Sequence, residues 1–291
     1  MIPKDLIKKI RRIQIRTSHM ADDVLAGQYH SAFKGQGMEF EEVREYTPGD
    51  DIRSIDWNVT ARQGRPFIKR FREERELTVM LLADVSASQG FGTAGQLKRE
   101  LAAEVGATLA FSAIRNNDKV GLIGFSDGIE RYVKPDKGTR HVLRVIRELL
   151  TLTARGRGTN IAAALEYLNR VARRRCVVFL ISDFQDKGFD SALRVARRRH
   201  DVVSICIGDP REAEMPPVRF IELEDAETGR RVIVDTASAA FRRQFRHAAM
   251  SRAENRKRDL RRLRSDSIEL TTGQSFVEPL IRFFHARETR N

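Results

Sequence analysis

The sequence predicts an α/β protein built on a doubly wound, mostly parallel sheet, with a small N-terminal α+β lobe. Short apolar runs without alternation recur along the chain, and such runs are typical of strands covered on both faces. Stretches with apolar residues at helical spacing separate these runs, and an alternation of strand and helix favours a parallel sheet. The first 76 residues break this alternation. We therefore divide the chain into the lobe (1–76), the α/β domain (77–235), and a basic C-terminal helix with covering elements (236–291).

The predicted lobe begins with an amphipathic helix over residues 4–26, whose apolar positions are Leu6, Ile10, Ile13 and Val24. A strand is expected over 39–46, followed by a turn at 47–51, where Pro and Gly supply turn geometry. Residues 67–72 alternate with period two, which indicates a second, half-buried strand.

The α/β domain takes its elements from apolar runs and helical periodicity. Strands are expected over 77–83, 119–125, 176–181 and 201–208, with a short edge strand over 130–133. Helices are expected from about 97 onward and over 139–150, 161–173 and 190–200. After the strand at 201–208 we expect short strands at 220–223 and 231–235. A basic helix follows, capped by Thr236 or Ser238 and ending near 264. A strand-like piece at 268–271 and a helix over 276–286 complete the chain. We interpret these last pieces as covering elements.

The formal charge of +13 over 291 residues calls for an acidic partner, such as nucleic acid, an anionic membrane surface or an acidic protein. The excess is dispersed, however, and basic residues near helix ends favourably meet the helix dipole. Aromatic residues of the kind that stack single-stranded bases are not interleaved with the basic clusters. Nucleic acid is therefore not the partner that we expect.

Cysteine usage and hydropathy bear on the compartment. Cys176 and Cys206 both fall inside apolar strand-like runs, so we expect buried, reduced thiols and no disulfide. No apolar run approaches the length of about 20 residues that a bilayer demands. The first residues lack the apolar core of a signal peptide, and we expect a cytoplasmic protein.

A polar cluster follows the first strand of the α/β domain. Asp84, Ser86 and Ser88 stand where the apolar run ends and before the next helix begins. Ligands of open α/β sheets bind outside the carboxyl ends of the strands. A carboxylate and two hydroxyls offer hard oxygen ligands, which suit Mg²⁺ or, less selectively, Ca²⁺ or Mn²⁺. The alternative is that an Asp and Ser pair only caps the following helix.

Two more stretches favour the metal. Thr159 lies in a glycine-rich loop that opens a helix, and Asp183 ends the strand expected at 176–181. The set Asp84, Ser86, Ser88, Thr159 and Asp183 resembles the metal-ion-dependent adhesion site of von Willebrand factor A domains. The resemblance implies that the hydroxyls contact the metal, that the acids act largely through water, and that a place is left for a partner's carboxylate. Mostly neutral direct ligands leave a divalent cation short of negative charge, which fits this scheme.

The N-terminal third carries a second resemblance. Its stretches 39–46, 48–51, 55–57, 60–62 and 72–76 are similar to the signature of a bacterial family, domain of unknown function 58. The resemblance extends over nearly the whole chain and implies a von Willebrand A-type domain. It also implies a link with MoxR-type AAA+ ATPases, for which this chain would act as an adaptor or assembly factor. Many members carry transmembrane helices before the signature; this chain resembles the soluble branch, and association with membrane-bound partners stays open.

Trp57, the single tryptophan, has two interpretations. In the first, Trp57 packs the lobe on the main domain while Asp56 and Arg62 tie the hairpin together. In the second, Asp56, Trp57 and Arg62 form a docking surface for the ATPase. The second interpretation rests on composition, because an aromatic residue beside Arg and Asp is typical of an interface anchor.

An enzyme is the competing class for the site. In a haloacid-dehalogenase-type phosphatase a second Asp serves as acid and base, but Ser86 holds that place and does no general acid work at neutral pH. No His lies near the five site residues in sequence, and no P-loop motif is present. We therefore expect a metal-dependent protein-interaction module without enzymatic activity. The alternatives are a binder of nucleic acid or anionic surfaces through the basic helix at 241–264, and a metal-assisted phosphohydrolase.

Overall fold

The structure is a computed structural model that describes residues 29, 31–33, 38–73 and 76–290. It contains two compact units, of which the smaller comprises residues 33–77. The larger unit holds the main sheet, and the segment 236–291 belongs to it. The helix predicted over 4–26 lies outside the described residues.

The small unit is a two-stranded sheet with a short helix in its connection. Strand β1 (Met38–Glu45) pairs antiparallel with β2 (Phe67–Glu73), as the sequence predicts, and the connection contains η2 (Ile52–Ser54) and α3 (Trp57–Gln63). The sequence analysis did not predict α3. Its end signals are nevertheless present: the Asp56 side chain accepts hydrogen bonds from the N–H groups of Asn58 and Val59, and Gly64 ends the helix with a φ of 68°.

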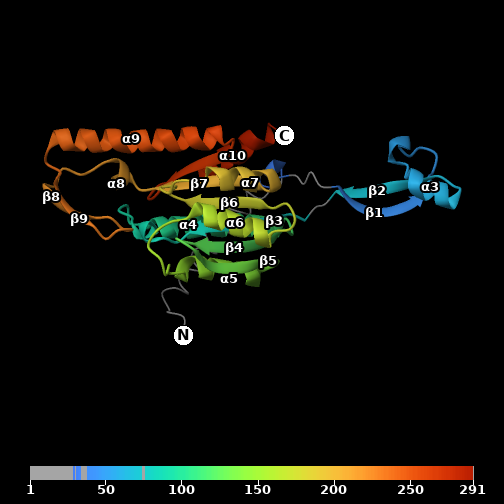
Figure 1. Cartoon of the computed structure of the whole chain (residues 1–291), viewed down its shortest axis with the longest axis horizontal. Helices are drawn as coiled ribbons and strands as arrows, with labels where there is room; N and C mark the ends of the chain where they lie inside the picture. Colours follow the sequence, from blue (N-terminus) through green and yellow to red (C-terminus); the bar gives the residue numbers. More distant parts are fainter. Residues whose placement is uncertain (1–28, 30, 34–37, 74–75, 291) are drawn as a thin grey trace. The chain divides into compact units, whose positions relative to one another are not determined.

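Among the described residues of the large unit, six strands form one sheet in the order β10-β7-β6-β3-β4-β5 (Figure 1). Its strands are β3 (Thr78–Asp84), β4 (Lys119–Phe125), β5 (Ile129–Asp136), β6 (Val177–Ser182), β7 (Asp201–Gly208) and β10 (Asp266–Thr271). All neighbours pair in parallel except β5, which runs antiparallel to β4 at the edge. The predicted α/β class with a mostly parallel sheet is thus confirmed.

Strand β10 corrects the prediction of a mere covering element. It pairs in parallel with β7 over its full length, from Asp266 opposite Val203 to Thr271 opposite Gly208. Its apolar residues alternate, with Ile268 and Leu270 buried and the residues on either side of them half-buried.

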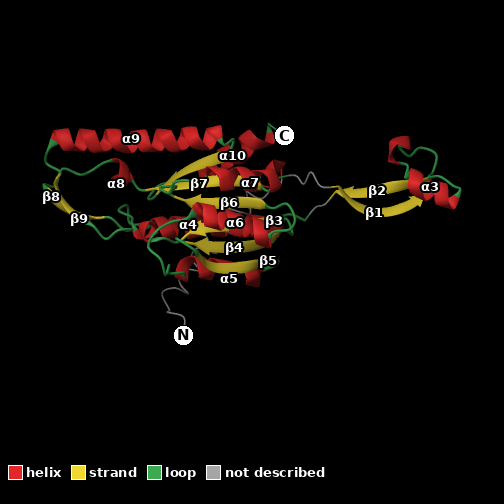
Figure 2. Cartoon of the chain, in the orientation of Figure 1, coloured by secondary structure: helices red, strands yellow, loops and turns green. Residues whose placement is uncertain are grey.

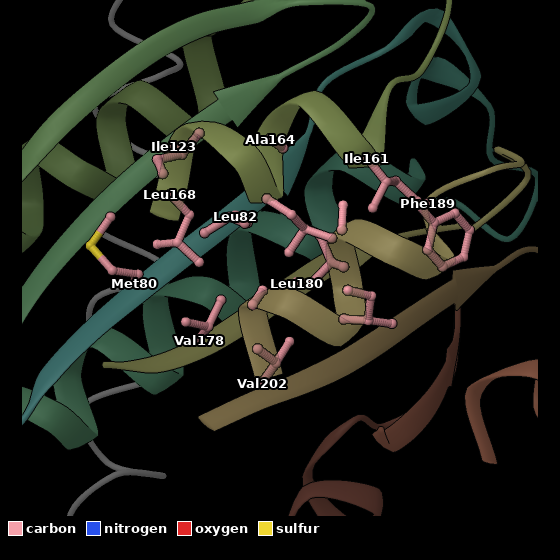
Figure 3. Close-up of a cluster of buried hydrophobic side chains, with 14 of the residues drawn as sticks. Met80, Leu82, Ile123, Ile161, Ala164, Leu168, Val178, Leu180, Phe189 and Val202 are labelled. Carbon is pink, nitrogen blue, oxygen red and sulfur yellow. The ribbon is translucent and has the colours of Figure 1, made fainter. Parts of the chain in front are cut away.

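Helices cover both faces of the sheet (Figure 2). The helices of the large unit include α4 (Lys98–Arg115), α5 (Thr139–Thr151), α6 (Ile161–Val171), α7 (Asp190–Arg199), the short α8 (Pro210–Ala213), α9 (Ala239–Arg262) and α10 (Val277–Glu288). Leu82 packs into the core with α6 and α7, whereas its neighbour Leu81 faces α4 at Gly106. Because successive side chains of a strand point to opposite faces, α4 and α6 lie on opposite sides of the sheet. Figure 3 shows Leu82, Val178 and Leu180 of the strands beside Ile161, Ala164 and Leu168 of α6.

The chain between β7 and β10 forms a hairpin and a long helix. Strand β8 (Phe220–Glu224) pairs antiparallel with β9 (Arg231–Asp235), and the Ser238 side chain caps α9, as predicted. Figure 1 shows this hairpin at the end of the sheet toward which the parallel strands point. Among the described residues, none of the helices is long and apolar enough to cross a membrane. Cys176 and Cys206 are buried free thiols, as expected.

Candidate metal centre

Asp84 ends strand β3 and is almost fully buried. Its Oδ1 accepts a hydrogen bond from the Ser86 N–H at 2.9 Å, and its Oδ2 accepts one from the Ser182 hydroxyl at 2.7 Å. Burial, and then the charge of Asp183, raises the pKa of Asp84 to about 6. Ionising Asp84 in the folded chain is therefore unfavourable, and a nearby positive charge would favour the ionised form.

Two serine hydroxyls lie beside this carboxylate. Ser86 is buried and Ser88 is half-buried, and their Oγ atoms are 3.1 Å apart. Adjacent oxygens in an octahedral Mg²⁺ site with bonds of 2.0–2.1 Å are roughly 3 Å apart. The pair therefore has the spacing of two neighbouring ligands of one small cation.

Asp183 follows the last residue of β6 and carries a feature that the sequence analysis did not anticipate. Its Oδ2 accepts a hydrogen bond from the Lys98 ammonium at 2.8 Å, and the same ammonium contacts Glu212 Oε1 at 2.7 Å. Lys98 is fully buried. Burial on its own lowers the pKa of Lys98, but the charges of Asp183 and Glu212 outweigh it and the pKa is raised. The lysine therefore stays charged and neutralises part of the site.

Thr159 comes from the glycine-rich loop before α6, and this loop lies against the serine loop. The Ala87 N–H donates to the Arg157 carbonyl at 3.3 Å. Glu130 of β5 holds the other side of the loop, because its Oε1 accepts from the Arg155 N–H at 2.8 Å. The Thr159 hydroxyl itself donates to Glu227 Oε1 at 3.3 Å. Thr159 thus lies on a loop next to the serines, while its hydroxyl bonds to a residue outside the predicted set.

Gly156 in this loop lies against the β4–β5 turn. A Cβ atom at this position would lie 2.0 Å from Oδ1 of Asp127. A side chain here would therefore require the exposed Asp127 carboxylate to move.

The residues present fit a divalent cation with mainly hydroxyl ligands. Two carboxylates, of which Asp84 is costly to ionise, lie beside a pair of hydroxyls at ligand spacing. Within the described part of the chain, no group of three or more His, Cys, Asp or Glu residues could hold a metal ion. This composition excludes a carboxylate-rich or thiolate site among those residues. The Lys98 charge reduces the negative charge that is available, which favours modest affinity.

The sequence predicted that Asp84, Ser86, Ser88 and Asp183 meet at one edge of the sheet, because the ends of parallel strands meet there. Their use as metal ligands stays a prediction. The sequence analysis missed Lys98, Gln89, Ser182 and Glu212, although Gln89 Nε2 lies 3.5 Å from Asp84. Ser182 could have been found, since it directly precedes Asp183 at a strand end. Lys98 opens a helix, where a lysine is ordinarily solvated, so only the fold reveals its role.

The three predicted docking residues lie in the small unit. Asp56 caps α3 and its Oδ2 lies 3.3 Å from the Lys69 ammonium of β2, so it does tie the helix to the hairpin. Trp57 is 68% exposed at the first position of α3, and Arg62 is exposed in the last turn. Their use as a docking surface stays a prediction.

Comparison with known proteins gives one family. The family described as "Protein of unknown function DUF58" matches residues 42–255. The uncharacterized protein Rv1480 of Mycobacterium tuberculosis is 32% identical over 287 residues, which cover 97% of this chain and 90% of that protein. The uncharacterized protein YeaD of Bacillus subtilis is 28% identical over 141 residues, or 47% of this chain and 31% of that protein.

Solved structures of similar fold are more distant. The protein BatB from Bacteroides thetaiotaomicron is 16% identical, with a TM-score of 0.48 over 74% of this chain and 100% of that one. The von Willebrand A domain of SpRpn10 is 13% identical, with a TM-score of 0.38 over 70% of this chain and 93% of that one.

Proposed function

The chain belongs to the DUF58 family of proteins of unknown function, and we propose that it is a metal-dependent protein-interaction module. One observation carries the proposal: Asp84, Ser86 and Ser88 share an edge of the sheet with Asp183, and burial, followed by the charge of Asp183, raises the pKa of Asp84. Two acids this close together, with hydroxyls beside them, are better explained by a bound cation than by side chains that only cap the following helix.

Each residue has a distinct role in the proposal. The hydroxyls of Ser86, Ser88 and Thr159 hold Mg²⁺, or Ca²⁺ or Mn²⁺ in its place, while Asp84 and Asp183 orient bound water. Neutral direct ligands leave the cation electrophilic, so it supplies a binding point for a carboxylate from a partner protein. Asp84 Oδ1 stays fixed by the Ser86 N–H, which orders the serine loop before any partner arrives.

The partner class follows from the family resemblance in the sequence. We propose that the chain works with a MoxR-type AAA+ ATPase in the cytoplasm, as an adaptor or assembly factor that presents a second protein to it. No catalytic step is assigned to this chain, because Ser86 stands where a phosphatase of the haloacid-dehalogenase type needs an acid. Any ATP hydrolysis then belongs to the partner.

The test compares capture of a purified MoxR-type ATPase by the immobilised full chain, with Mg²⁺ and with EDTA. Wild type is set beside Asp84→Ala, Ser88→Ala and the control Glu166→Ala, whose side chain is exposed on α6. We expect capture by wild type and the control in Mg²⁺ only. Equal capture by all four proteins in EDTA would show that the site is structural and would move the search to the surface around Trp57.

A further inference from the structure

The turn between β8 and β9 brings a carboxylate to the candidate metal centre. Glu227 Oε1 accepts the hydrogen bond of the Thr159 hydroxyl at 3.3 Å, across 68 residues of sequence. The hairpin that carries Glu227 belongs to neither the main sheet nor its covering helices. The sequence analysis treated it only as a turn in a covering element, and nothing in its composition distinguished Glu227 from other exposed acids.

The turn is built so that Glu227 is held in place. The Asp225 side chain accepts hydrogen bonds from the N–H groups of Glu227 at 3.0 Å and Thr228 at 2.9 Å. The Gly229 N–H closes the turn on the Asp225 carbonyl at 2.8 Å.

Gly229 also shows how closely the turn approaches the loop of Thr159. Its φ of 70° is in the left-handed region that favours glycine, and a Cβ there would lie 3.0 Å from the Arg157 guanidinium. Two contacts, Glu227 on Thr159 and Gly229 beside Arg157, therefore join the turn to the same loop. The first contact is a hydrogen bond and the second is packing against the Arg157 side chain, and both place the β8–β9 turn beside the loop of Thr159.

We propose that Glu227 is the carboxylate that this chain itself supplies to the metal centre, in the place that a partner's carboxylate takes. The inference rests on the proposed function, because it needs a cation held by Ser86, Ser88 and Thr159. Glu227 adds negative charge to a set whose direct ligands are neutral and whose Asp183 is partly neutralised by Lys98. A partner then binds by displacing the β8–β9 turn.

The hairpin can be displaced at low cost. Among the described residues, β8 and β9 pair only with each other, and an isolated two-stranded hairpin is marginally stable. None of the residues of β8 and β9 is fully buried: Phe220 and Ile233 are 72% and 71% exposed, and the inward residues Ile221, Leu223 and Val234 are half-buried. Little apolar surface is therefore lost from the core when the hairpin moves. The turn is therefore ordered in itself but weakly attached to the domain.

The test uses Mn²⁺ alone as the probe, titrated calorimetrically into the full chain. Wild type is compared with Glu227→Gln and with the control Glu224→Gln, whose carboxylate lies on the same hairpin and pairs with Arg231. Because affinity follows the number of charged ligands, we expect Glu227→Gln to weaken Mn²⁺ binding about tenfold and Glu224→Gln to change it less than about twofold. Hydrogen exchange should show Mn²⁺-dependent protection of residues 225–230 in wild type only.

Displacement is tested with acetate as a minimal carboxylate. Protein-bound Mn²⁺ broadens the methyl resonance of acetate that reaches the site, and we expect more broadening with Glu227→Gln than with wild type. If Glu227→Gln binds Mn²⁺ as tightly as wild type and residues 225–230 gain no protection, Glu227 is not a ligand, and the proposed function stands without it. If wild type shows no Mn²⁺ binding that Ser86→Ala abolishes, the proposed function fails together with this inference.

Discussion

Lys98 is the residue that most distinguishes this site from a simple set of acids and hydroxyls. Its ammonium is fully buried and bridges Asp183 of the candidate metal centre to Glu212 of α8. A buried charge keeps its ionised form only when it is paired, and here two carboxylates share one cation. Lys98 therefore balances the charge of Asp183 and Glu212, and under the proposed function it would compete with a metal for Asp183.

Replacing Lys98 by Met tests this balance. We expect Lys98→Met to lower the free energy of unfolding by about 3–5 kcal/mol in EDTA, because both carboxylates lose their buried partner. Mg²⁺ should restore part of the loss. Urea unfolding followed by circular dichroism measures both effects, with the exposed Lys187→Met as a control expected to change stability by less than about 0.5 kcal/mol. A Lys98→Met protein as stable as the control would contradict the assignment.

Asp84 gives a prediction that depends on pH. Its pKa rises from 3.8 to about 6 on folding, mainly through burial, so the folded chain favours the protonated form. The contribution of Asp84 to stability is then fully present below pH 3.8 and is lost as the pH rises through 6, by about 3 kcal/mol in total.

Asp84→Asn stays neutral and keeps an acceptor for the Ser86 N–H, so it avoids that loss. In EDTA we expect the variant to be more stable than wild type by about 3 kcal/mol near pH 7.5 and by only about 1 kcal/mol near pH 4.5. Mg²⁺ should stabilise wild type alone. If the difference in stability between the two proteins does not change with pH, ionising Asp84 does not destabilise the folded chain, and the prediction is wrong.

The C-terminal half of the long helix α9 packs into the core of the domain, whereas in its N-terminal half only Ala249 is buried. Leu260 is buried in the core with α6 and α7, and the Arg197 guanidinium of α7 donates to the Leu263 carbonyl at 2.6 Å. Met250, ten residues earlier, is 56% exposed. The sequence predicted the helix, its cap and its thin apolar content, but not which part of it packs.

Two matched truncations test this attachment. Leu260→Ala should cost about 2–5 kcal/mol of stability, because it opens a cavity in a packed core. Met250→Ala should change stability by less than about 0.5 kcal/mol. Equal costs in thermal or urea unfolding would contradict the anchored C-terminal half and would indicate that the whole helix packs.

For the molecule as a whole, the sequence predicted the sheet well, because buried parallel strands have continuous apolar sequences such as 77–83 and 176–181. It placed β10 outside the sheet, because the polar residues Ser267, Glu269 and Thr271 interrupt its apolar residues and give a weaker strand signal. Asp84, Ser86, Ser88 and Asp183 could be found from strand ends alone. Lys98, Glu212 and Glu227 could not, since side chains from α4, α8 and the β8–β9 turn meet the site only through the tertiary fold.

The net charge of +13 gives a further prediction at this scale. Several basic residues of α9 are already paired within the chain, among them Arg256 with Glu269 at 2.6 Å and Arg262 with Asp190 at 2.7 Å. We therefore expect only non-specific binding to duplex DNA, with a Kd of about 10 µM or weaker near 150 mM salt. Fluorescence anisotropy over a salt series measures it. Tight binding with a steep salt dependence would favour the basic helix as the functional surface.

The most direct test of a metal-dependent module is calorimetric titration of the full chain with Mn²⁺ at neutral pH, for wild type, Ser86→Ala and Ser88→Ala. The serine variants keep the Asp84 carboxylate and remove one proposed ligand each. We predict one Mn²⁺ per chain for wild type and at least about tenfold weaker binding for either variant. Binding that is absent in wild type, or equal in all three proteins, would contradict the claim that these hydroxyls hold a cation.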